Sequence, residues 1–169
     1  MCALVRADHE DQDRALVAML DPRTENDELP ALLDVLRLAS AVHVAAEAKV
    51  FEALLDVLRG PEVLRLIVAN ARDEHAAQHR MLDALSLARP GSDVWNGHAL
   101  ELRVLLLDHA SRADLARWTI QDHVPTRLQR ALARDYATER MRILARTSPV
   151  ALAKAQLAAQ AAAVAGIVR

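Results

Sequence analysis

The chain has 169 residues, with 21 lysines and arginines, 23 aspartates and glutamates, and a formal net charge of −2. This length suits one compact domain and is too short for two domains of ordinary size. Because the basic and acidic residues are interleaved, we expect no single-sign surface that binds nucleic acid. Cys2 is the only cysteine, which excludes an intrachain disulfide and a thiolate cluster within the chain. A metal site in this chain must therefore use nitrogen and oxygen ligands.

The composition predicts an all-α protein. Glycine and proline are scarce, and the residues that favour helices dominate. Proline and glycine divide the chain into helices, because they start and stop them. We expect helices over residues 4–20, 26–59, 61–88, 96–124 with Asn96 as the N-cap, 125–148, and in the alanine-rich stretch 151–169. Short connections between the first four favour an up-down-up-down four-helix bundle with additional C-terminal helices.

We divide the chain into a bundle over residues 1–124 and a C-terminal helical extension over residues 125–169. The last stretch has few large apolar side chains, so it either docks on the same compact unit or packs against a partner, for example a second copy in a homodimer. The chain shows no basic segment followed by an apolar one at its start, and no segment approaches the roughly 20 apolar residues of a membrane span. We expect a soluble, cytoplasmic protein with no membrane partner.

The most informative pattern is a set of histidines and carboxylates at helical spacing. His43 and Glu47 are four residues apart, and so are His75 and His79. Residues four apart share a helix face, so each pair can reach one metal centre. Imidazole suits iron, zinc or copper, and a carboxylate can bridge two cations. A single pair of this kind is also typical of an ordinary, partly exposed helix, so the prediction of a dinuclear metal site depends on the joint pattern over four helices.

The first and fourth predicted helices extend the pattern. His9 lies on the first, and His109 with Asp114 on the fourth, where His109 follows three leucines on a face that should point inward. The step of five residues to Asp114 turns a regular helix by about 140° and makes it the weakest candidate. The complete candidate metal set is His9, His43, Glu47, His75, His79, His109 and Asp114.

In its order and spacing, this set resembles the ligand pattern of hemerythrins and hemerythrin-like domains. That pattern is one His on the first helix, HxxxE on the second, HxxxH on the third and HxxxxD on the fourth, and all seven positions are filled here. The resemblance covers roughly residues 4–124. It implies His75, His79 and His109 on one iron, His9 and His43 on the other, and both carboxylates as bridges.

The resemblance implies a non-haem di-iron protein that binds O₂ or a related small molecule, NO or peroxide, for sensing, storage or detoxification. The chain has only four aromatic side chains and carries Ala48 where many such domains have a second acidic residue, which favours a divergent member over a dedicated oxygen carrier. We expect a binding protein rather than an enzyme, with at most weak peroxide- or NO-related activity.

Other interpretations of the same residues stay open. One is a helical regulatory or interaction module without a redox metal, and the ligand types also suit zinc or manganese. No His here has a Glu three residues before it, which argues against a ferritin-type di-iron site. No glycine-rich nucleophile elbow or phosphate loop is present. Glu74, Asp73 and Asp108 adjoin candidate ligands and can accept a hydrogen bond from an imidazole N–H, although solvated positions are the favoured interpretation. His98 and His123 suit surface or capping positions.

Overall fold

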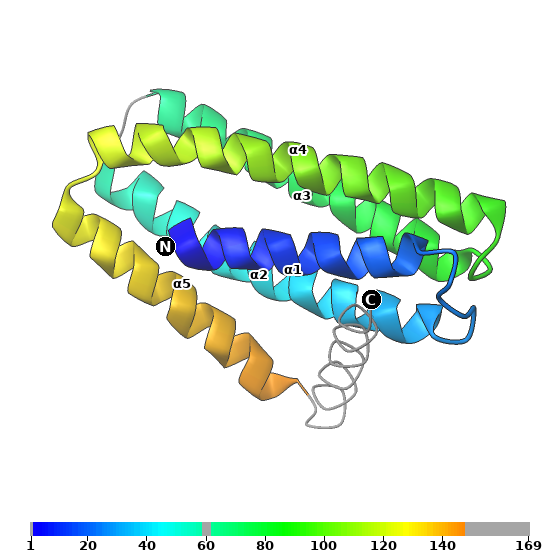
Figure 1. The fold of residues 1–169 in the computed structure, drawn as a ribbon. Coiled ribbons are helices and arrows are strands. Elements are labelled where there is room, and N and C mark those ends of the chain that lie inside the picture. Colours follow the sequence, from blue (N-terminus) through cyan, green and yellow to red (C-terminus); the bar gives the residue numbers. More distant parts are fainter. Residues whose placement is uncertain (1, 59–61, 148–169) are drawn as a thin grey trace, which may run out of the picture.

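The computed structural model describes residues 2–58 and 62–147, which form five helices and no strand. The helices are α1 (Cys2–Leu20), α2 (Leu29–Leu58), α3 (Glu62–Leu87), α4 (Asp93–His123) and α5 (Thr126–Arg146). The prediction of an all-α fold is confirmed. In Figure 1, α1 to α4 lie along a common axis and the chain reverses direction from each to the next, while α5 diverges from that axis.

The helix ends follow local chemistry, with one difference from expectation. Ser92, not Asn96, is the N-cap of α4, and its hydroxyl oxygen accepts a hydrogen bond from the backbone N–H of Trp95 at 3.2 Å. A serine at this position satisfies an otherwise unpaired N–H of the first turn. Pro125 directly precedes α5, where a missing N–H costs nothing.

Gly91 lies in the α3–α4 connection, where this loop packs against the α1–α2 connection. Its φ is +74°, and a Cβ built there would lie 1.9 Å from Asn26 Oδ1 in the α1–α2 connection. Only a residue without a side chain permits both the left-handed backbone and this close approach. The connection between α3 and α4 thus depends on that glycine.

The buried apolar side chains form two separate clusters. One, at the end of the bundle where Trp95 lies, comprises Leu16, Met19, Leu29, Leu33, Leu36, Leu82, Leu85, Trp95, Ala99, Leu102 and Leu106. The other comprises Ala46, Val50, Phe51, Leu54, Leu64, Val68, Ala71, Ile120, Val124, Leu132 and Tyr136. The middle turns of α1 to α4 carry the buried polar side chains Asp8, Gln12, Ser40, His43, Glu47, His75, Gln78 and His109.

Helix α2 is the central helix, since it packs against α1, α3 and α5. By length and composition alone, Leu29–Leu55 is apolar enough to cross a membrane, which differs from our expectation for the sequence. The core helix of a soluble protein passes the same test, and α2 buries the polar residues His43 and Glu47 inside the bundle. The finding is therefore weak evidence for a membrane span.

Helix α5 packs along α2 and contributes Leu132 and Tyr136 to the second apolar cluster. It covers the bundle beside the polar residues rather than extending away from it, so the first helix of the predicted C-terminal extension contacts the bundle. The expected helix at 151–169 lies outside the described residues, and its docking or homodimer role stays a prediction.

Candidate metal centre

Four buried side chains converge at the centre of the bundle. His43 and Glu47 come from α2, His75 from α3 and His109 from α4, and one potential ligand atom of each lies within 4.8 Å of the others. Each residue occupies an inward position of its helix, as the spacing predicts. Three imidazoles and one carboxylate form a donor set that suits a transition-metal ion.

The distances match a ligand shell. His109 Nε2 lies 3.3 Å from His43 Nε2 and 3.3 Å from His75 Nε2. Glu47 Oε2 lies 3.2 Å from His75 Nε2 and 3.7 Å from each of the other two. A tetrahedral ion with bonds of about 2.0–2.1 Å separates its ligand atoms by about 3.3–3.4 Å. The side chains thus stand close to the spacing that an ion between them requires.

Hydrogen bonds on the far side of two rings decide which nitrogen faces the cluster. His109 Nδ1 donates to Glu74 Oε2 at 2.7 Å, because an ionised carboxylate can only accept. The Tyr136 hydroxyl donates to Asp8 Oδ2 at 2.7 Å, so its oxygen accepts from His43 Nδ1 at 3.0 Å. With the ring proton on Nδ1, each neutral imidazole presents an Nε2 lone pair to the cluster.

The electrostatics of the cluster favour a cation. Burial, the largest effect, lowers the pKa of His43 to about 3, so that its ring is neutral near pH 7. Burial opposes ionisation of Glu47, but contact with His75 and the other imidazoles lowers the pKa of Glu47 to about 2. Glu47 Oε2 is buried and makes no hydrogen bond within the described residues. The lone pair of neutral His43 and the Glu47 carboxylate therefore both face the centre of the group.

His9 stands beside this group. Its Nε2 lies 3.2 Å from His43 Nε2, and its ring packs edge-on against His109 with centroids 5.1 Å apart. Burial, and then the proximity of His109, lower the pKa of His9 to about 4. The structure thus brings a fifth predicted residue, from α1, to the edge of the four-residue group.

His79 is not brought to the cluster. The buried face of α3 runs through Ala71, His75, Gln78 and Leu82, which leaves His79 exposed. The step from 75 to 78 lies on the inward side of the helix, whereas 79 is rotated away from it. In this structure Gln78, rather than the predicted His79, shares the inward face with His75.

Asp114 is also outside the cluster. It is exposed, with its side chain at 55% accessibility, and its Oδ1 pairs with Arg6 Nη2 of α1 at 3.2 Å. The five-residue step from His109 turns it toward α1 instead of the bundle axis. Asp114 therefore lies at the edge of the cavity that leads to the cluster.

Sequence reasoning missed two of the three residues behind the ligands, Tyr136 and Asp8, and named the third, Glu74. Tyr136 of α5 is fully buried and links His43 to Asp8, whose Oδ1 accepts from Arg140 Nε at 2.9 Å. Burial raises the pKa of Tyr136 well above its usual range, so the hydroxyl keeps its proton. The sequence makes Glu74 a candidate acceptor for an imidazole N–H but favours a solvated role; in the structure it contacts His109 and also pairs with Arg112. No pattern around Tyr136 in the sequence indicates its role.

Two buried amides lie one helical turn from the histidines. Gln12 on α1 and Gln78 on α3 are 1% and 2% exposed, and Gln12 Oε1 and Nε2 and Gln78 Nε2 make no hydrogen bond within the described residues. Buried polar atoms normally have partners. They add to the polar character of the layer that separates the two apolar clusters.

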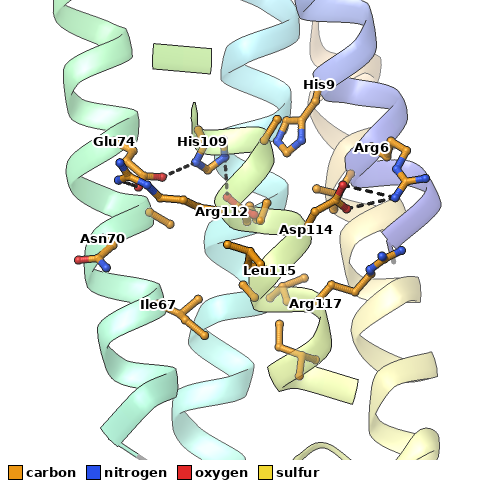
Figure 2. Close-up of a pocket in the computed structure, with 18 of the residues that line it drawn as sticks. Arg6, His9, Ile67, Asn70, Glu74, His109, Arg112, Asp114, Leu115 and Arg117 are labelled. Carbon is orange, nitrogen blue, oxygen red and sulfur yellow. Dashed lines mark hydrogen bonds and ion pairs between the residues drawn. The ribbon is translucent and has the colours of Figure 1, made fainter. Parts of the chain in front are cut away.

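A cavity of about 580 Å³ connects the cluster to solvent. Figure 2 shows His9 and His109 toward one end, and Ile67, Leu115 and Arg117 farther along it. Apolar side chains make most of its wall, and Glu47, His9 and His109 are the cluster members that reach it. A ligand could approach the cluster by this route.

No protein-family model, curated protein or solved structure matches the chain.

Proposed function

We propose that this protein binds a metal ion at His43, Glu47, His75 and His109 and uses it to hold a small molecule. The observation that carries the proposal is the approach of two Nε2 atoms, those of His43 and His109, to 3.3 Å beside the Glu47 carboxylate; in the neutral rings both atoms carry lone pairs. Without a proton or a cation between them, these lone pairs repel one another. A bound cation accepts both lone pairs as ligands and so removes the repulsion. Part of its binding free energy then stabilises the fold.

We further propose iron as the metal and O₂, NO or peroxide as the small molecule, in keeping with the resemblance to hemerythrin-like proteins. The mixture of imidazole and carboxylate ligands suits iron. The chain's own residues would fix two of the three imidazoles, His43 through Tyr136 and His109 through Glu74, and limit the access of water through the largely apolar cavity. Such a site favours binding or sensing over rapid turnover, and we propose that the protein is soluble and cytoplasmic.

The number of ions separates two versions of this proposal. The four-residue group is sufficient for one ion, with His9 as a nearby fifth donor. A di-iron centre of the hemerythrin kind needs His79 to turn inward and Asp114 to leave Arg6. Breaking that exposed ion pair costs at most about 1 kcal/mol, which two strong metal ligands can offset.

Metal analysis of four purified variants tests both versions. Wild-type protein loaded anaerobically with Fe²⁺ should hold iron, and His75→Ala should abolish its binding. Under the di-iron version, His79→Ala and Asp114→Asn should each reduce two ions per chain to one or fewer. Under the single-ion version, both should retain the wild-type content. His98→Ala, a partly exposed histidine near the start of α4 and outside the cluster, is the matched control.

Binding of the small molecule is tested on the loaded protein. Absorption bands of the iron that change reversibly with O₂, NO or azide support the proposal. Wild-type protein that takes up no metal under these conditions would refute it and favour the helical interaction module.

A further inference from the structure

The cavity beside the metal cluster is much larger than a diatomic ligand requires. It measures about 580 Å³, whereas one molecule of liquid water occupies roughly 30 Å³. This volume falls in the range of sites that bind organic molecules, roughly 300–1,000 Å³. The cavity is wide beside α4 because the side chains that line it there, those of Ala110, Ala113 and Ala116, are small, and larger side chains would fill the space.

Aliphatic and aromatic side chains form the wall from several helices. Val5 of α1, Val50 and Phe51 of α2, and Ile67 of α3 face the cavity together with Ile120 of α4. Such a wall favours an apolar ligand body, because its burial removes apolar surface from water.

The charged groups at the rim are mostly neutralised by each other. Arg6 pairs with Asp114, and Arg112 pairs with Glu74. Asp13 accepts from Arg103 at 2.8 Å. Glu10 is exposed and lies next to His9, at the metal end of the cavity.

Arg117 is different from the other arginines of the rim. It is only partly exposed, its Nε is buried without a hydrogen-bond partner, and no carboxylate pairs with it among the described side chains, those of residues 3–55 and 62–147. Its guanidinium carbon lies 5.2 Å from the Trp118 ring centroid, an attraction that leaves its N–H donors available. In Figure 2 the Arg117 side chain lies at the far side of Asp114 from the histidines.

We propose that this cavity binds a single-chain aliphatic carboxylate, with the carboxylate on Arg117 and the chain running between the apolar walls toward the cluster. An arginine fork matches the two oxygens of a carboxylate. Arg117 and His109 are eight residues apart on α4, which is about 12 Å along the helix. An extended chain advances about 1.2 Å per atom, so the cavity suits a chain of about ten carbons. Because this binding needs no metal, it can fail or succeed independently of the proposed function.

Calorimetric titration of metal-free protein with decanoate tests the proposal, with decanol and butyrate as comparison ligands. Decanoate should bind, and decanol should bind about tenfold more weakly or worse, since it cannot form the charged pair. Butyrate, too short to fill the cavity, should show little binding. Absence of decanoate binding to the wild-type protein would overturn the proposal without any variant.

Three variants locate the ligand. Arg117→Gln should weaken decanoate binding about tenfold or more and leave decanol binding unchanged. Ala113→Leu should weaken both, because it places a larger side chain in the cavity. Arg80→Gln, an exposed arginine outside the cavity, should change neither. Equal decanoate affinity in Arg117→Gln and wild type, or an unaltered affinity in correctly folded Ala113→Leu, would place the ligand elsewhere and refute the assignment.

Discussion

Replacing Tyr136 with phenylalanine isolates the hydrogen bonds that support the metal cluster. The ring is fully buried against the second apolar cluster, so phenylalanine keeps the packing and removes only the hydroxyl. That hydroxyl contacts His43 Nδ1 at 3.0 Å and Asp8 Oδ2 at 2.7 Å. The variant therefore leaves one buried donor and one buried acceptor without this partner.

The size of the effect follows from those two groups. A buried polar group that loses its partner costs about 1–3 kcal/mol. Because Asp8 keeps its hydrogen bond from Arg140, the cost at Asp8 should be near the lower limit of this range. We expect metal-free Tyr136→Phe to lose about 2–4 kcal/mol of unfolding free energy. Metal affinity should fall about 10–100-fold, because the imidazole of His43 is no longer fixed by its outer hydrogen bond.

Urea unfolding of the metal-free protein and metal titration against a chelator measure the two effects separately. Glu74→Gln, which alters the carboxylate that holds His109, should likewise lower metal affinity. Asp83→Asn, an exposed carboxylate on the same helix, should alter neither quantity by more than about 0.5 kcal/mol. If Tyr136→Phe binds metal as tightly as wild type and unfolds at the same urea concentration, the hydroxyl has no supporting role.

Two further predictions concern pH and the glycines. Because the folded-state pKa values of His9 and His43 are about 4 and 3, both below the unfolded value of 6.5, the unfolded chain binds protons first as pH falls. Metal-free stability should therefore be highest above pH 6.5 and decrease below it by up to about 1.4 kcal/mol per pH unit for each ring. Urea midpoints that stay constant down to about pH 5 would contradict this. Gly91→Ala should destabilise the protein by about 1 kcal/mol or more, since alanine would meet both a positive φ and Asn26. Gly97→Ala, exposed in α4 with no atom near its Cβ, should instead stabilise it by up to about 1 kcal/mol. Thermal unfolding of both variants tests this: the melting temperature should fall in Gly91→Ala and rise in Gly97→Ala, relative to wild type.

The sequence predicted the helices and the inner part of the site because both depend on local periodicity. Prolines and glycines mark helix ends directly, and the structure begins α3 at Glu62 and α5 at Thr126, next to the prolines used to predict them. His43 and Glu47 share a face through their four-residue spacing alone. His75 and His109 fall on the inward faces of their helices, as their apolar neighbours indicate.

The remaining site residues depend on information that periodicity does not carry. Spacing places His79 near His75 but does not say on which side of it the helix meets the core, and the structure turns Gln78 inward instead. Tyr136 and Asp8 are 128 positions apart, and their contact exists only because α5 packs on α2 beside α1. Such a contact follows from tertiary packing, which a single sequence does not reveal.

The two separate apolar clusters have a consequence for how the bundle opens. The polar layer between them contributes little cohesion in the metal-free protein, so each end can exchange its amide hydrogens as its own cooperative unit. An ion in that polar layer, held by ligands from α2, α3 and α4, would link the three helices and couple the opening of the two ends of the bundle. Hydrogen exchange should then slow together at Leu36 and Val68, which lie in different clusters, when the protein takes up metal. Ion binding would thus change the bundle from two units that open separately into one unit that opens cooperatively.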